Sequence, residues 1–92
     1  MEEVSEQIRY AIVIEKANGN YSAYAPDLPG CVATGASIEE TEAEMREAIV
    51  FHLEGLRADG LAIPIPMSHV DYVEIPAQAF APVNEDRRRL RD

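Results

Sequence analysis

One stretch of helix-forming sequence, residues 38–58, is the strongest constraint on the fold of this 92-residue chain. A capping box precedes it: Ser37 can accept a hydrogen bond from the backbone N–H of Glu40, and the Glu40 side chain can reach back. Acidic residues in the first turn also suit the positive end of the helix dipole. Gly60 is placed to cap the other end. We therefore predict one long helix from Ile38 to Ala58.

The predicted helix has an apolar stripe along one side, and that stripe needs a surface to cover it. The stripe consists of Ile38, Thr41, Met45, Ile49, Leu53 and Leu56, with Ala48 and His52 alongside. A small sheet built from the preceding residues is the natural partner for such a helix.

Three strands are predicted before the helix. Residues 8–15 alternate, with Ile8, Tyr10, Ile12 and Ile14 on one face, which is the period of a strand. Asn18-Gly19 is the strongest short hairpin signal, and the return strand should span about residues 21–25. Two prolines then interrupt the pairing because neither can donate a ladder hydrogen bond. Residues 31–36 are predicted as the third strand.

After the helix, Pro64 and Pro66 predict an extended connector, and residues 70–75 read as a fourth strand ended by Pro76. The order is β-β-β-α-β, a small antiparallel sheet packed by one long helix, which places the chain in the α+β class. One helix covers one face of the sheet, so we expect a second copy to cover the other in a homodimer. The predicted segments are a polar N-terminal arm (1–7), the α+β domain (8–76) and an Arg-rich C-terminal tail (77–92).

Composition narrows the class of protein. The chain is 47% hydrophobic, which suits one small folded domain. It has no apolar run long enough to cross a bilayer, and its acidic N-terminus lacks the apolar core of a signal peptide, so we expect a cytoplasmic protein without membrane attachment. A single cysteine cannot form an internal disulfide.

The charge of the chain is strongly uneven. The formal net charge is −9, and four of the eight basic residues lie in the Arg87–Arg91 run. Residues 1–86 alone carry 16 acidic and 4 basic residues, a net charge of −12. Nucleic acid should repel such a body, whereas a basic protein should be attracted to it, in particular a basic protein that itself binds RNA or DNA.

Catalytic and metal sites are weakly indicated. Cys31 is the one candidate nucleophile, with His52 or His69 as its base, but a small buried apolar role is commoner for such a cysteine. His52 and Glu54 point to different sides of the helix, and His69 with Asp71 lacks a third metal ligand. We therefore predict no catalytic residue, no metal site and no cofactor.

The segment Pro26–Gly30 indicates recognition by a rigid loop. Its two prolines fix φ, and Gly30 permits a bend that other residues make only at a cost. Tyr21 and Tyr24 face opposite sides of a strand, so one ring can enter the core while the other is free for a partner. The predicted partner-binding residues are Tyr24, Pro26, Asp27, Leu28 and Pro29, together with the helix acids Glu47 and Glu54.

These segments, in this order and spacing, resemble the HicB antitoxin family over about residues 8–66. The matching stretches are YAIVIE (10–15), YSAYAPDLPGCVATG (21–35), SIEE (37–40), REAI (46–49) and HLEGL (52–56). The resemblance implies a β-β-β-α-β module similar to a partial ribonuclease H fold. It also implies the antitoxin half of a type II toxin–antitoxin pair, whose toxin is a small basic ribonuclease of the HicA type that cleaves messenger RNA and is masked by direct binding.

Two departures from that family shape the expectation. Members often carry a C-terminal helix-turn-helix or ribbon-helix-helix domain that binds the operator, but only 17 residues follow the predicted fourth strand here. Operator binding by this chain alone is therefore not expected. The first strand offers only Glu15 as an acidic ligand, whereas a two-metal nuclease needs several, so we predict no nuclease activity. Two alternatives stay open: a stand-alone oligomeric module that binds another protein or a small ligand, and an enzyme that uses Cys31 or a carboxylate pair.

Overall fold

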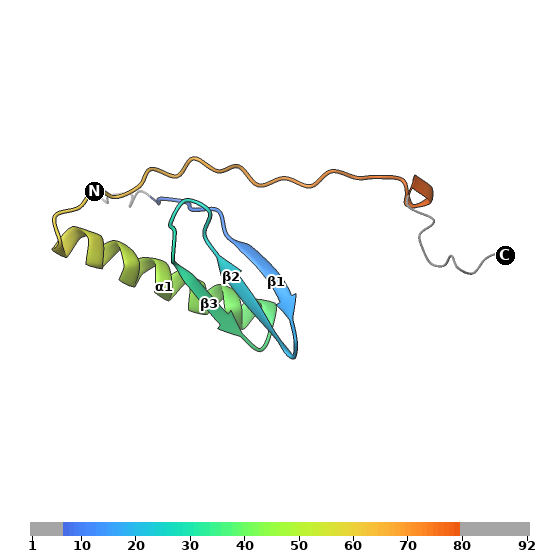
Figure 1. Ribbon diagram of the computed structural model, residues 1–92, viewed down its shortest axis with the longest axis horizontal. Coiled ribbons are helices and arrows are strands. Elements are labelled where there is room, and N and C mark those ends of the chain that lie inside the picture. The colour runs from blue at the N-terminus through green and yellow to red at the C-terminus, as the bar shows by residue number, and fades with distance from the viewer. Residues whose placement is uncertain (1–6, 80–92) are drawn as a thin grey trace, which may run out of the picture.

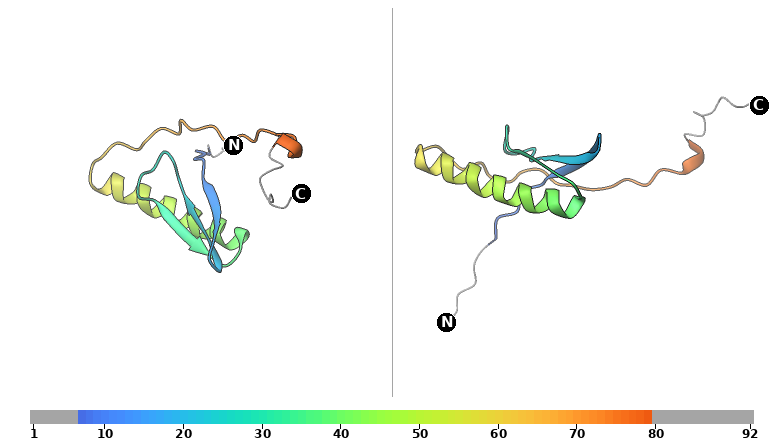
Figure 2. Two further views of the ribbon diagram at one scale, coloured as in Figure 1. Left: turned by 45° about the vertical axis from the view of Figure 1, so that its right-hand side comes forward. Right: turned by 90° about the horizontal axis from the view of Figure 1, so that it is seen from below.

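The computed structural model describes residues 7–79, in which three strands precede one long helix. The elements are β1 (Val13–Ala17), β2 (Asn20–Tyr24), β3 (Val32–Gly35), α1 (Ile38–Ala58) and the one-turn 3-10 helix η1 (Ala77–Ala79). The strands pair antiparallel in the order β1-β2-β3. Helix α1 packs on one face of this sheet (Figure 1), and the two layers are seen edge-on in Figure 2. The predicted α+β class is confirmed.

The β1–β2 hairpin forms where the sequence predicts it. Ala17 pairs with Asn20 across the two-residue turn, and Gly19 has a φ of 76°, which glycine adopts without strain. The pairing ends at Val13 and Tyr24, because the chain after β2 turns away at Pro26. The predicted first strand over 8–15 is therefore assigned only from Val13, and residues 8–12 continue its line without strand pairing.

Helix α1 begins where its N-terminal cap predicts. The Ser37 hydroxyl oxygen accepts a hydrogen bond from the Glu40 backbone N–H at 3.0 Å, which confirms that part of the capping box. The Thr41 hydroxyl donates to the Ser37 carbonyl oxygen at 2.7 Å. The first of these bonds satisfies one of the backbone N–H groups that a helix start leaves without an intrahelical partner.

The C-terminal end of α1 is a Schellman motif. The Leu61 N–H donates to the Leu56 carbonyl at 2.9 Å, and the Gly60 N–H donates to the Arg57 carbonyl at 3.0 Å. Asp59 is the cap, and Gly60 follows it with a φ of 72°. The predicted helix bounds are confirmed, although the cap is Asp59 and not Gly60.

The hydrophobic core is small and lies between the sheet and α1. Its buried members are Ala23, Ala25, Leu28, Cys31 and Met45. Leu28 and Met45 are its large side chains, and both are 0% exposed. Half-buried residues from β1, β3 and α1, and from the segment before β1, pack around this centre.

The predicted fourth strand over residues 70–75 is wrong for the single chain. This segment is extended, but it is not part of the sheet, and residues 62–79 make no backbone–backbone hydrogen bond to another part of the described chain. A strand needs a neighbour whose N–H and C=O groups complete the ladder. Here the chain leaves the body instead (Figure 1), so the observed order is β-β-β-α.

The two predicted terminal segments fall largely outside the described residues. Of the N-terminal arm only Gln7 is described, and of the Arg-rich tail only residues 77–79 are described. Within residues 7–79, no helix is long and apolar enough to span a membrane.

Candidate partner-binding surface

The loop between β2 and β3 consists of two consecutive turns. The Leu28 N–H donates to the Ala25 carbonyl, and the Cys31 N–H donates to the Leu28 carbonyl, both at 3.0 Å. A proline occupies the second position of each turn, and Gly30, with a φ of 84°, occupies the third position of the second turn, as type II geometry requires. The loop therefore has a defined shape.

Two residues of this loop region face the core. The Leu28 side chain is 0% exposed, so it cannot reach a partner in this conformation. Cys31 is buried as well, and burial raises the pKa of its thiol. A raised pKa disfavours the thiolate that nucleophilic chemistry needs. The structure thus places both side chains in packing roles.

Asp27 fastens the segment after the helix to the loop. Its Oδ2 accepts hydrogen bonds from the backbone N–H groups of Met67 and Ser68, and its Oδ1 accepts one from the Ser68 hydroxyl, each at 2.9 Å. The bond from the Met67 N–H, followed by the two from Ser68, lowers the pKa of Asp27. Nearby, the Tyr10 hydroxyl donates to the Pro64 carbonyl. Asp27 was predicted to meet a partner, but its carboxylate is occupied within the chain.

Replacing Asp27 by Asn should loosen this attachment. We expect the Met67 and Ser68 amides to exchange hydrogen about tenfold faster, because a neutral amide accepts weaker hydrogen bonds than a carboxylate. Asp71→Asn is the matched control, since Asp71 is exposed and its Oδ1 accepts only from the adjacent Tyr72 N–H. Hydrogen-exchange NMR near pH 6 measures both variants. Unchanged exchange in Asp27→Asn would contradict this role.

The same contact has a defined pH dependence. Because the folded-state pKa of Asp27 lies below its ordinary value of 3.8, its stabilisation is complete above about pH 4. It is lost as the pH falls through the lowered, folded-state pKa. The Asp27 carboxyl resonance should accordingly titrate below the ordinary aspartate value of 3.8.

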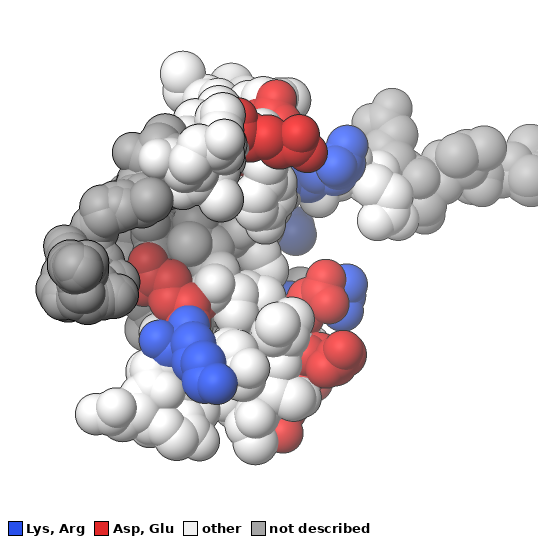
Figure 3. All heavy atoms as spheres, turned by 90° about the vertical axis from the view of Figure 1, so that its right-hand side faces the viewer, with Lys and Arg blue, Asp and Glu red and all other residues white. Residues whose placement is uncertain are grey.

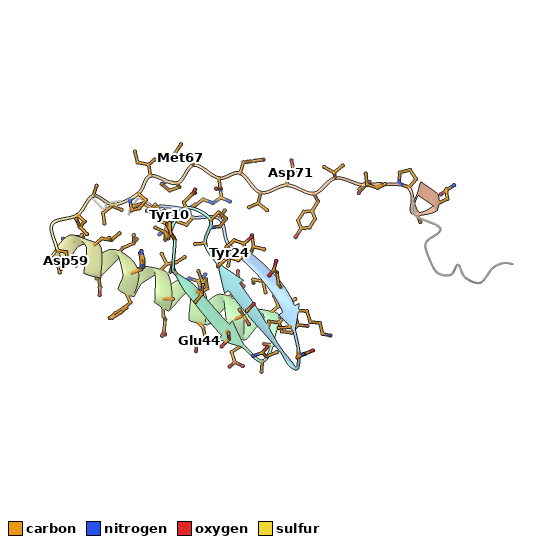
Figure 4. All side chains as sticks on the ribbon, viewed as in Figure 1. Tyr10, Tyr24, Glu44, Asp59, Met67 and Asp71 are labelled. Carbon is orange, nitrogen blue, oxygen red and sulfur yellow. The ribbon has the colours of Figure 1, made fainter. Side chains whose placement is uncertain are left out.

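Helix α1 turns an acidic face away from the sheet. Five exposed residues, spaced three or four apart, share this side, which we call the outer helix face: Glu40, Glu44, Glu47, Phe51 and Glu54. The buried Thr41 and Met45 lie on the core-facing side, about a third of a turn round the helix from the middle of this face. In Figure 4 the labelled Glu44 lies on the side of α1 away from the labelled Met67.

Of this face, the sequence predicted only Glu47 and Glu54 to bind a partner and missed Glu40, Glu44 and Phe51. Phe51 is the most distinctive of the three. Its side chain is 79% exposed among carboxylates. A large aromatic residue outside the apolar stripe of an amphipathic helix was the available signal. Such exposed apolar groups, ringed by polar ones, are typical of interaction sites.

The structure divides the predicted partner-binding residues into two separate groups. Glu47 and Glu54 belong to the outer helix face. Tyr24 is 42% exposed, and it points to the sheet face away from α1 because its neighbour Ala23 is buried. Pro26 and Pro29 are also exposed, in the loop that follows β2. Tyr21 shares the face of the buried Ala23 because the two are two residues apart on β2, so the predicted opposite placement of the two tyrosines is confirmed.

Outside the outer helix face, the charged groups of the described residues form no comparable acidic surface. The face shown in Figure 3 carries Lys or Arg side chains beside Asp and Glu, so the acidic excess is not uniform over the molecule. His69 Nε2 lies 3.8 Å from Asp71 Oδ2 on the strongly exposed segment after α1. Among residues 7–79, no group of three or more His, Cys, Asp or Glu side chains is placed to hold a metal ion.

Comparison with known proteins identifies the family. Residues 10–81 match the sequence pattern described as the HicB-like antitoxin of bacterial toxin–antitoxin systems. The chain belongs to the HicB-like antitoxin family. The match includes the loop between β2 and β3, all of α1 and the segment that follows α1. It therefore extends beyond residues 8–66, over which the sequence resembles the family.

Individual relatives agree with this assignment. A UPF0150 protein of Helicobacter pylori is 48% identical over 50 residues, covering 54% of this chain and 69% of that protein. An uncharacterized 14.9 kDa protein of Haemophilus phage HP1 is 37% identical over 67 residues, covering 73% of this HicB-like chain but only 50% of the phage protein. A chain of a solved HicA3 and HicB3 toxin–antitoxin complex superposes with a TM-score of 0.58 at 30% identity, covering 65% of this chain and 70% of that one.

Proposed function

We propose that this HicB-like chain is an antitoxin that binds and masks a small basic messenger-RNA-cleaving ribonuclease of the HicA type. The observation that carries the proposal is the family match over residues 10–81. The similarity to a chain of a HicA3 and HicB3 complex supports a partner of the HicA type. The net charge of −9 supports it independently, because opposite charge steers and orients a basic partner.

The outer helix face is the surface that we assign to the toxin. Its four glutamates can pair with the basic groups that a ribonuclease uses to hold RNA. Phe51, between Glu47 and Glu54, supplies an aromatic anchor, and binding energy concentrates at such residues. The exposed loop group of Tyr24, Pro26 and Pro29 is the second candidate surface. Leu28 and Asp27 are left out because the core and the segment after α1 occupy them.

The proposed mechanism is steric and electrostatic masking by a non-catalytic cytoplasmic protein. Covering the RNA-binding surface of the toxin prevents substrate access without any bond being made or broken. We further propose that the antitoxin acts as a homodimer, because α1 covers only one face of the sheet. The partial ribonuclease H likeness stays a prediction of the family resemblance.

The outer helix face is tested by reversing one charge. Glu47→Arg should raise the Kd for the purified toxin about 10- to 100-fold, because it removes an attractive contact and adds a repulsive one. Glu15→Arg is the matched control, since Glu15 is also exposed but lies on β1. Titration calorimetry at two salt concentrations measures both variants.

The outcomes are distinguishable. Equal weakening by Glu47→Arg and Glu15→Arg would indicate general charge attraction and contradict a specific outer helix face. The antitoxin assignment itself is tested by co-expression with each small basic protein encoded in a neighbouring reading frame. Restored growth and a stable complex support it. If growth is not restored and no complex forms, the antitoxin assignment is refuted. That outcome would favour a stand-alone HicB-like module that binds another protein or ligand.

A further inference from the structure

A groove of about 580 Å³ lies between residues 7–12 and helix α1. Its apolar lining comes from both sides and consists of Ile8, Ile12, Met45, Ile49, Val50 and Leu53. Its charged lining residues are Arg9, Arg46 and Glu42, so bases outnumber acids by one. The helix packs mainly against β3 and β2 and only marginally against β1, so the groove lies where the sheet ends beneath α1.

The groove runs beside a free strand edge. β1 pairs with β2 on one side only, and its other edge has no neighbour among the described residues. Residues 8–12 continue this edge without strand pairing, and all of them except Ala11 line the groove. The backbone groups of such an edge are available to an added strand, and the side chains of that strand can enter adjacent pockets.

The same chain carries an extended segment with the complementary properties. Residues 69–76, which we call the C-terminal arm, expose Val70, Tyr72, Val73 and Ile75 to 52%, 90%, 81% and 52%. The arm makes no backbone–backbone hydrogen bond to another part of the described chain. Its two acids, Asp71 and Glu74, are opposite in sign to the net charge of the groove, where Arg9 and Arg46 outnumber Glu42.

We propose that the C-terminal arm of one copy lies along the free β1 edge of a second copy and fills its groove, and that the exchange is reciprocal. The arm would then form in its partner's sheet the fourth strand that the sequence pattern predicts. A reciprocal exchange is closed and two-fold symmetric, and it removes a free edge in each copy. This inference goes beyond antitoxin action and does not depend on the identity of the toxin.

The contacts just before the arm explain why the arm does not bind the groove of its own chain. Tyr10 holds Pro64, and Asp27 holds Met67 and Ser68, so the chain is fastened to its own body immediately before the arm. Beyond Ser68, the arm points away from the sheet and the helix (Figure 1). A second copy can meet it there without breaking these contacts.

Three charge substitutions test the exchange in the full-length chain. Val50→Asp in the groove and Val73→Asp in the arm should each raise the dimer dissociation constant about tenfold or more. Val32→Asp is the control, because Val32 is 63% exposed on β3, at the opposite edge of the sheet. Light scattering over a concentration series gives the mass, and circular dichroism checks that each variant folds. The proposal would be overturned if the parent chain is a monomer. It would also be overturned if both test variants dimerise as the parent does, or if only Val32→Asp weakens the dimer.

Cysteine cross-linking distinguishes an arm that binds the groove of a second copy from an arm that folds back into the groove of its own chain. One tagged chain carries Val50→Cys, and a second, differently tagged chain carries Val73→Cys or the same-face alternative Ile75→Cys. Oxidation of the mixture should give a covalent heterodimer of the two tags. The parent chain is the control, because its single cysteine, Cys31, is buried. A bridge formed only when both substitutions are in one chain, within a monomer, would overturn the proposal, as would the absence of any heterodimer.

Discussion

Leu28→Ala is expected to lower the free energy of unfolding by about 2–5 kcal/mol, the usual range for a buried leucine. The side chain is 0% exposed and packs in a core whose other members, apart from Met45, are alanines and a cysteine. A core this small can relax only partly around the lost volume. Since small domains are stable by only about 5–15 kcal/mol, the variant should lose a large part of its stability.

Urea unfolding of the parent and variant, at one fixed protein concentration, measures this change. Leu61→Ala is the matched control. Leu61 is 56% exposed, so the same substitution should cost less than about 1 kcal/mol there. If Leu28→Ala costs no more than Leu61→Ala, the loop does not contribute to the core as the structure shows.

Gly35→Ala is expected to destabilise the fold by about 1–3 kcal/mol through overpacking. A Cβ at this position would lie 2.6 Å from Thr41 Oγ1, 2.7 Å from the Thr41 backbone nitrogen and 2.9 Å from its Cα. Two of these atoms are backbone in the first turn of α1. That turn is held in place because Thr41 is buried and its N–H donates to the Ser37 carbonyl at 2.9 Å. The clash therefore has to shift the helix against β3.

Gly55→Ala provides a control in which the same chemical change has the opposite sign. Gly55 lies within α1, and an added Cβ would meet nothing within 4 Å. Alanine is preferred over glycine in a helix, so this variant should gain up to about 1 kcal/mol. Thermal and urea unfolding of both variants give the two signs. A neutral or stabilising Gly35→Ala would contradict the close approach of α1 to β3.

Several features of the fold could be predicted because short-range chemistry determines them. The Asn18-Gly19 turn specifies the hairpin, and Ser37 with Glu40 specifies the helix start. The prolines and Gly30 similarly predict a loop of defined shape between β2 and β3. In each case the groups that satisfy the backbone lie within a few residues of one another.

The candidate site was less predictable because it depends on what packs against what. Phe51 lies outside the predicted apolar stripe, but only the packing of α1 on the sheet shows that it is 79% exposed. The separation of Tyr24 from Glu47 and Glu54 likewise follows from the two-layer arrangement. Residues 70–75 have the composition of a strand, but they join no sheet within the chain because strand formation needs a partner edge.

The sequence by itself determined the hairpin, the bounds of α1, the acidic character of the molecule and membership of the HicB-like family, since each depends on local patterns or on composition. Only the tertiary structure decided the roles of Leu28 and Asp27 in the same short loop. Leu28 is buried in the core, and Asp27 binds Met67 and Ser68, some 40 residues away along the chain. Contacts between residues so far apart form only after the helix has folded back over the sheet, so no local pattern encodes them.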